Sequence, residues 1–140
     1  MNTQLLRHIT NSSLKENIPT FKVGQTVRVH QRIKEGDKSR LQVFEGMIIK
    51  LHLADGVSDT FTVRKVVDGV GVERIFPVHS PVIAKVEITK ESQTRRSKLY
   101  YLRDRAGKAA RMKTTMLENV VFEPVPLGHT KRKAEEAVEA

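Results

Sequence analysis

Apolar and polar residues alternate along much of the chain with a period of two, which is the pattern of half-buried β-strands. The first such run covers residues 21–32 and is bent at Gly24. Similar runs predict further strands over residues 41–53, 60–67, 70–76, 82–88, 99–102 and 119–122. Short strands with no long helix between them favour an antiparallel all-β fold, and the sequence predicts a small barrel.

Turn residues separate these runs. Residues 33–40 form a polar connection in which Gly36 and Asp37 are the predicted turn. Asp68 and Gly69 predict a tight hairpin turn. The sequence PVHSP at residues 77–81 predicts a stiff, extended bend, because a proline cannot donate a ladder hydrogen bond at its own position.

The two ends of the chain have other patterns. The spacing of Leu5, Leu6 and Ile9 predicts the apolar stripe of a short N-terminal helix. The stretch GHTKRKAEEAVEA, which begins at Gly128, has few residues able to fill a core and is typical of a tail. We therefore divide the chain into a helix and linker (residues 1–18), a barrel with a basic segment (19–123) and a C-terminal tail (124–140).

Composition adds a charge bias to this plan. The 140 residues are enough for one domain and contain 25 Lys and Arg against 16 Asp and Glu. Ten of the basic residues and only three acidic ones lie within residues 85–115. Such a local excess favours binding to a polyanion. The apolar runs are far shorter than a membrane helix and the start lacks a secretory pattern, so we expect a cytoplasmic protein without a membrane partner.

No catalytic or cofactor-binding pattern is present. The chain has no cysteine, and its five histidines lie at least 22 residues apart, so the zinc-binding spacing of two histidines on one helical turn is missing. Carboxylate pairs fall in predicted turns, where solvent exposure leaves them unsuited to acid–base catalysis. We expect no enzyme activity, no metal, no cofactor and no small-molecule substrate.

The basic, aromatic stretch TRRSKLYYLRDRAGKAARMK, residues 94–113, carries the strongest functional pattern. Arginine can donate two parallel hydrogen bonds to phosphate oxygens, lysine adds a mobile positive charge, and tyrosine can stack on a base. The alternative is that Leu99, Leu102 and one of the two tyrosines pack in the core while the charges are merely solvated. The candidate RNA contacts here are Arg95, Arg96, Lys98, Tyr100, Tyr101, Arg103, Arg105, Lys108, Arg111 and Lys113.

Three long motifs resemble one known family. They are FKVGQTVRVHQRIKEGDKSRLQVFEGMII (residues 21–49), GVGVERIFPVHSPVI (69–83) and RRSKLYYLRDRAGKAARMK (95–113). In this order and at this spacing they resemble the bacterial-type large-subunit ribosomal protein L-nineteen family, over roughly residues 5–122. The tail after Gly128 departs from the shorter family pattern.

This resemblance implies an SH3-like barrel with a short N-terminal helix and a structural role in the large ribosomal subunit. It implies binding to large-subunit ribosomal RNA near the face that meets the small subunit, a contribution to an intersubunit bridge, and contact with small-subunit RNA. It also implies the large-subunit proteins numbered three and fourteen as neighbours. Matching positions in the proline loop add Arg74, His79 and Ser80, with Pro77 and Pro81, as candidate contacts.

Two other functions stay open at the level of the residues. A free-standing SH3-like nucleic-acid-binding factor in transcription or RNA processing would show the same charge and fold. A small hydrolase that uses Asp or His side chains, such as His79, belongs to a different class altogether.

Overall fold

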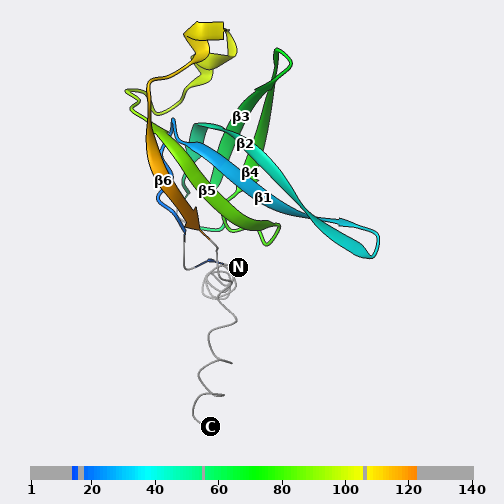
Figure 1. The fold of residues 1–140 in the computed structure, drawn as a ribbon. Helices are drawn as coiled ribbons and strands as arrows, with labels where there is room; N and C mark the ends of the chain where they lie inside the picture. The colour runs from blue at the N-terminus through cyan, green and yellow to red at the C-terminus, as the bar shows by residue number, and fades with distance from the viewer. Residues whose placement is uncertain (1–13, 16–17, 55, 106, 123–140) are drawn as a thin grey trace, which may run out of the picture.

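The computed structural model describes residues 14–15, 18–54, 56–105 and 107–122 (Figure 1). Six strands and two short 3₁₀ helices make up this part of the chain. They are β1 (Thr26–Glu35), β2 (Lys38–His52), β3 (Thr60–Val67), β4 (Val70–Pro77), β5 (Ile83–Ser92), η1 (Tyr100–Arg103), η2 (Gly107–Ala110) and β6 (Thr114–Phe122).

The strands form one antiparallel sheet in the order β4-β3-β2-β1-β5-β6, with every neighbouring pair antiparallel. The predicted mainly β, antiparallel architecture is therefore confirmed. The predicted closed barrel is wrong for the described residues, because β4 and β6 are the two edges of the sheet and do not pair with each other. The sheet curls around its core but stays open, since β6 returns beside β5 and adds an edge there.

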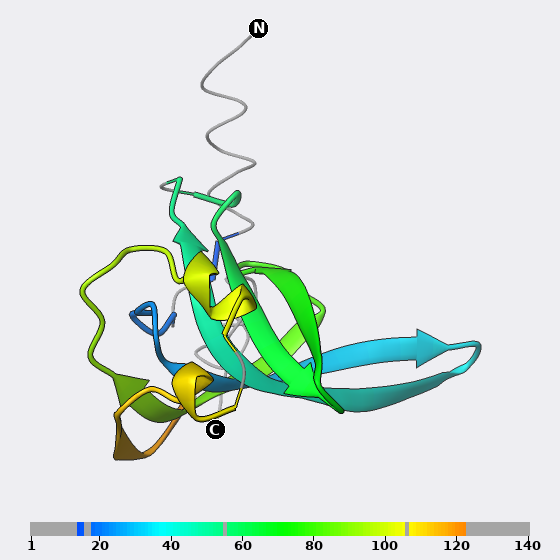
Figure 2. The same ribbon diagram turned by 90° about the horizontal axis from the view of Figure 1, so that it is seen from above.

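The β1–β2 hairpin is longer than the sequence predicts. Its register runs from Thr26 opposite Met47 to Glu35 opposite Lys38, so the expected polar connection over residues 33–40 is wrong except for its turn at Gly36 and Asp37. The side chains here are mostly exposed, so the strands lose the alternation that predicts a buried face while their backbones stay paired. Figures 1 and 2 both show this hairpin projecting beyond the rest of the sheet.

The hairpin turn between β3 and β4 is confirmed. Asp68 and Gly69 both have positive φ angles, of 50° and 81°, as a type I′ turn requires. The extended bend predicted for the proline-containing segment after β4 is wrong. The Ser80 and Ile83 N–H groups donate to the Pro77 and Ser80 carbonyls, at 3.3 and 3.2 Å, and so form turns before β5 begins at Ile83. The first predicted run is shorter than expected, since β1 begins only at Thr26 and a turn occupies Val23 and Gly24.

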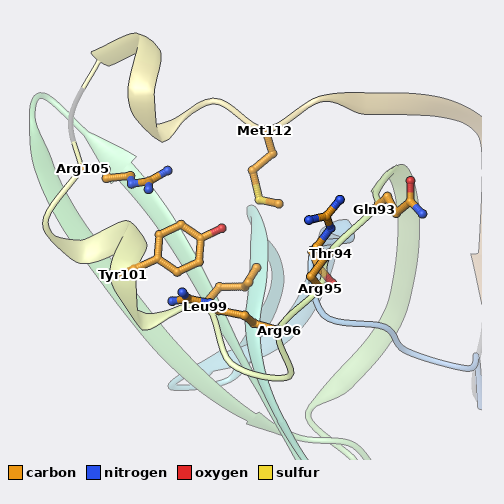
Figure 3. Close-up of a pocket in the computed structure, with 8 residues that line it drawn as sticks. All are labelled: Gln93, Thr94, Arg95, Arg96, Leu99, Tyr101, Arg105 and Met112. Atoms are coloured by element: carbon orange, nitrogen blue, oxygen red, sulfur yellow. The ribbon is translucent and has the colours of Figure 1, made fainter.

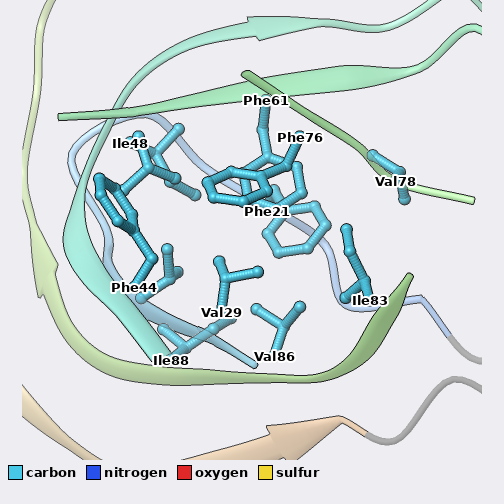
Figure 4. Packing of buried hydrophobic residues seen from close by; sticks show 12 residues of the cluster. Phe21, Val29, Phe44, Ile48, Phe61, Phe76, Val78, Ile83, Val86 and Ile88 are labelled. Carbon is cyan, nitrogen blue, oxygen red and sulfur yellow. The ribbon is translucent and has the colours of Figure 1, made fainter. Parts of the chain in front are cut away.

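The main core lies inside the curl of the sheet (Figure 4). Phe61 stacks on Phe21 with ring centroids 4.7 Å apart and on Phe76 at 5.5 Å. Phe44 contacts the other side of this group, 5.7 Å from Phe76. These rings come from β2, β3, β4 and the segment before β1, so their packing joins one edge of the sheet to its centre.

A second, smaller core holds the segment between β5 and β6 against the sheet. Ile49, Leu99 and Leu102 are buried together, and Met112 packs against them. The strand predicted over residues 99–102 is wrong: this stretch enters the 3₁₀ helix η1. Residues three apart eclipse in a 3₁₀ helix, so this conformation turns Leu99 and Leu102 toward the same side. A strand would have turned them to opposite faces.

The predicted N-terminal helix around Leu5 and the predicted tail both fall outside the described residues. Within the described ranges, no helix has the length and apolar character needed to cross a membrane.

Candidate nucleic-acid interface

The cations predicted to contact RNA gather on the segment of residues 93–113, which we call the basic segment. It connects β5 to β6 and includes η1 and η2, coloured yellow at the top of Figure 1. Its eight Lys and Arg side chains are all exposed: Arg95, Arg96, Lys98, Arg103, Arg105, Lys108, Arg111 and Lys113. An exposed row of one sign is a surface suited to a phosphate backbone.

The basic segment is attached to the sheet by backbone and apolar contacts. The Leu99 N–H donates to the Ile49 carbonyl at 2.9 Å, and Lys98 forms an isolated β-bridge with Lys50. Leu99 and Leu102 are buried beneath this connection. The alternative interpretation is thus correct for the two leucines, which pack in the core, and the cations next to them are exposed to solvent.

An acidic side chain on β4 fixes one of the cations. The Arg103 guanidinium donates two hydrogen bonds to the Glu73 carboxylate, at 2.9 Å from Nε and 2.7 Å from Nη2. Arg64 donates a third from Nη1 at 2.9 Å. Gly71 leaves room for that guanidinium, since a Cβ at this position would collide with Arg64 Nη2. The hydrogen bonds from Arg103, with a smaller contribution from Arg64, hold the pKa of Glu73 below its ordinary value despite partial burial.

Both tyrosines of the basic segment stack on arginines. The Tyr101 ring lies between the guanidinium groups of Arg105, 4.7 Å from the ring centroid, and Arg96, at 5.4 Å (Figure 3). Arg103 lies 4.6 Å from the centroid of Tyr100. These cation–π contacts orient the guanidinium groups and keep them close together despite their mutual repulsion.

The RNA contacts predicted in the proline loop lie in different surroundings. Arg74 packs over Phe44 and Phe76, 5.5 Å from each ring centroid, and is only half-exposed. His79 accepts a hydrogen bond at Nδ1 from the backbone N–H of Lys15, 3.1 Å away. The Lys15 ammonium in turn donates to the Ser80 carbonyl at 2.6 Å.

His79 and Ser80 do not join the basic segment. Pro77, the last residue of β4, follows Glu73 by four residues, which is about 13 Å along an extended strand. In Figure 1 the loop that follows β4 lies at the other end of the sheet from the basic segment. The structure thus brings together the cations of residues 95–113 and leaves the proline loop as a separate candidate contact.

Sequence reasoning missed Glu73, since an acidic residue is not expected in a surface for phosphates. The only indication in the sequence is that Glu73 is an acidic residue next to Arg74 in a basic protein, where a carboxylate is expected to pair with a cation. Among the side chains that the structure describes, Arg95, Lys98, Lys108, Arg111 and Lys113 have no carboxylate partner. The arrangement can therefore neutralise phosphates at several points while Arg103 serves as an anchor.

A family model described as Ribosomal protein L19 matches residues 4–115, which is well over half of the chain and includes the whole basic segment. The chain belongs to the ribosomal protein L19 family. The resemblance drawn from the three motifs is thereby confirmed.

Membership in the L19 family gives the chain its general role. It is a structural protein of the large ribosomal subunit, it functions in translation on the ribosome in the cytoplasm, and it is not an enzyme. Its partners are ribosomal RNA and ribosomal proteins. The L19 match overturns the hydrolase alternative and favours the ribosomal role over a free-standing factor.

Proposed function

We propose that the basic segment is the principal RNA-binding surface of this chain and that it holds large-subunit ribosomal RNA near the subunit interface. The observation that carries this proposal is the row of exposed cations, fixed to the sheet by Leu99, Leu102 and the pairing of Arg103 with Glu73. A surface held in place before binding loses less side-chain entropy when it meets the RNA.

The proposal includes the finer points that family resemblance implies. At the interface the chain contributes to an intersubunit bridge and approaches small-subunit RNA, with large-subunit proteins three and fourteen as its neighbours. His79, Ser80 and Arg74 form a second, smaller RNA contact. The proposal also keeps the division of the chain into a helix and linker (residues 1–18), a sheet with the basic segment (19–123) and a tail (124–140). Recognition of the RNA goes through shape and phosphates, because double-stranded RNA has a deep groove that side chains do not read.

Salt dependence of RNA binding tests the main surface. The triple change of Arg95, Arg96 and Lys98 to alanine removes three cations of the basic segment. The slope of log K against log salt should flatten by about 0.7 to 0.9 for each phosphate that the variant no longer neutralises.

A matched control removes the same charge elsewhere. Lys22, Arg28 and Arg40 are paired with Glu91, Glu45 and Glu35, at 2.9, 2.8 and 2.7 Å. Changing these three to alanine should leave the slope nearly unaltered, because their charge is already neutralised. Equal slopes for both triple variants would contradict the assignment of the basic segment.

The interface role has its own measurement. Large subunits assembled with either triple variant are mixed with small subunits, and their association is followed by light scattering as the Mg²⁺ concentration is lowered. We expect the Arg95, Arg96 and Lys98 variant to need more Mg²⁺ than the control. Crosslinking in intact ribosomes, with mapping of the linked nucleotides, identifies the RNA on each side.

A further inference from the structure

A cavity of about 390 Å³ opens within the basic segment, beside Tyr101 (Figure 3). Its wall is made by the chain just after β5, by η1 and the residue before it, and by one residue before and one residue after η2. The lining includes Leu99, Met112, Tyr101 and the arginines Arg95, Arg96 and Arg105. This volume is near the lower end of the roughly 300 to 1,000 Å³ found for small-molecule sites, so the cavity has the size for a single small unit.

The lining combines two kinds of chemistry. Leu99 and Met112 give one apolar side, where a thioether can contact the face or edge of an aromatic ring. Arg95, Arg96 and Arg105 give a cationic side. An inorganic anion alone would make no use of the apolar side, and an uncharged apolar molecule would leave the arginines unneutralised. The occupant that fits both has a flat ring and an attached phosphate.

Several donors in the cavity are open to such an occupant. Arg96 and Arg105 use their flat faces on Tyr101, which leaves their N–H groups free at the edges. Arg95 has no hydrogen-bond or ion-pair partner among the described side chains, and Figure 3 shows its guanidinium directed toward Met112 across the cavity. The Tyr101 hydroxyl is directed into the same space.

A second cavity adjoins the first and shares Gln93, Thr94 and Arg96 with it. Because the two cavities share this wall, an adjoining nucleotide of the same RNA chain can lie in the second cavity.

We propose that the cavity beside Tyr101 binds one unstacked nucleotide of an RNA, with the base against Met112 and Leu99 and its phosphate against Arg95 and Arg105. This inference rests on the proposed RNA-binding function and adds to it a preference for a bulged or looped nucleotide. Protein sites that bind RNA bases use such splayed nucleotides, because bases within a helix are inaccessible.

The test compares two RNA hairpins that differ in a single unpaired adenosine. In one version the bulged base is replaced by 2-aminopurine, whose fluorescence reports a change in stacking. The native protein should bind the bulged hairpin several-fold more tightly than the fully paired one, because only the bulged base is free to leave the helix and pack against Met112 and Leu99. Equal affinity for the two hairpins would overturn the proposal.

Two uncharged variants separate the cavity from the general charge. Met112→Ala should remove much of the preference for the bulge and leave the salt slope unaltered. Since Met112 also packs against the second core, Gln93→Ala provides a variant at an exposed position that leaves this packing intact. Lys113→Ala, outside the cavity, should weaken both hairpins equally. If neither cavity variant reduces the preference for the bulge, the proposal is wrong.

Adenosine monophosphate distinguishes a nucleotide in a chain from a free one. We expect it to compete with the bulged hairpin only at millimolar concentrations, since it lacks the contacts to adjoining phosphates. Competition at micromolar concentrations would show that the free nucleotide is the ligand and would overturn the assignment to RNA. Failure to bind either hairpin at low salt would instead contradict the proposed RNA-binding function itself.

Discussion

The Glu73 carboxylate on β4 accepts two hydrogen bonds from the Arg103 guanidinium of η1, thirty residues away in the chain. Glu73 is also bound by Arg64 of β3 and has only 22% of its side chain exposed. This one carboxylate therefore joins β3, β4 and the basic segment. An acidic residue is thus part of a surface whose other charged side chains are suited to binding phosphates.

Glu73→Gln should weaken RNA binding although it makes the protein more positive. The neutral amide cannot accept two charge-assisted hydrogen bonds from Arg103, so the docked position of η1 is destabilised. We expect an affinity for RNA several-fold lower at fixed salt. Glu45→Gln is the matched control, because Glu45 pairs with Arg28 on the sheet and has no contact with η1. An affinity that rises equally in both variants would show that only net charge matters.

Acid should release the basic segment before the main core unfolds. Because the pKa of Glu73 is lower in the folded protein, chiefly through Arg103, the pairing stabilises the docked state fully above the unfolded value of about 4.3 and is lost as pH falls through the folded value. The chain has two tyrosines, adjacent in η1, and no tryptophan. Intrinsic emission therefore reports this segment alone.

The measurement is tyrosine emission of the free protein between pH 7 and pH 2, with far-ultraviolet circular dichroism recorded in parallel. The native protein should show an emission change below about pH 4 that precedes loss of the β signal. Glu73→Gln should lack this separate step. An identical titration in the two proteins would exclude Glu73 as its origin.

The sequence predicted well wherever side-chain alternation and backbone geometry agree. The turn at Asp68 and Gly69 follows from local conformational preference, and β3 and β4 on either side of it were found within one residue. The outer half of the β1–β2 hairpin was missed, because exposed strand segments such as residues 38–40 show no buried face in their sequence. Pairing there is decided by the partner strand.

The sequence predicted which residues make up the candidate site but not how they are arranged in space. The cations of residues 95–113 could be chosen from the sequence since charge and aromatic content are local properties. The 3₁₀ conformation of η1 could not, because it depends on Leu99 and Leu102 finding Ile49 of β2. The same holds for closure of the barrel, which depends on where β6 pairs after a long connection.

The core depends most on Phe61. Its ring is 1% exposed and stacks on both Phe21 and Phe76. Phe61→Ala should lower the free energy of unfolding by about 3 to 5 kcal/mol, through reduced burial and the cavity left behind. Leu41→Ala, where the side chain is 58% exposed on the β1–β2 hairpin, should change it by less than about 0.5 kcal/mol. Urea denaturation of both variants checks this contrast, and equal losses would contradict it.

Lys15 fixes the loop between β4 and β5 from outside the sheet. Its ammonium donates to the carbonyls of Ser80 and Ile83, at 2.6 and 3.2 Å. Lys15→Met keeps most of the apolar stem and leaves both carbonyls without this donor. The variant should be less stable by about 1 to 3 kcal/mol at pH 7, the cost of unpaired buried polar groups.

The pH dependence of this loss has a definite sign. Burial lowers the pKa of Lys15 in the folded protein, so the unfolded chain holds the proton more tightly. Stability contributed by Lys15 therefore rises as pH increases through the lowered folded pKa toward the unfolded value. Urea denaturation at pH 7 and pH 9.5 should show a difference between the native protein and Lys15→Met that widens at the higher pH. A difference that narrows at the higher pH would refute the assignment of this pH dependence to Lys15.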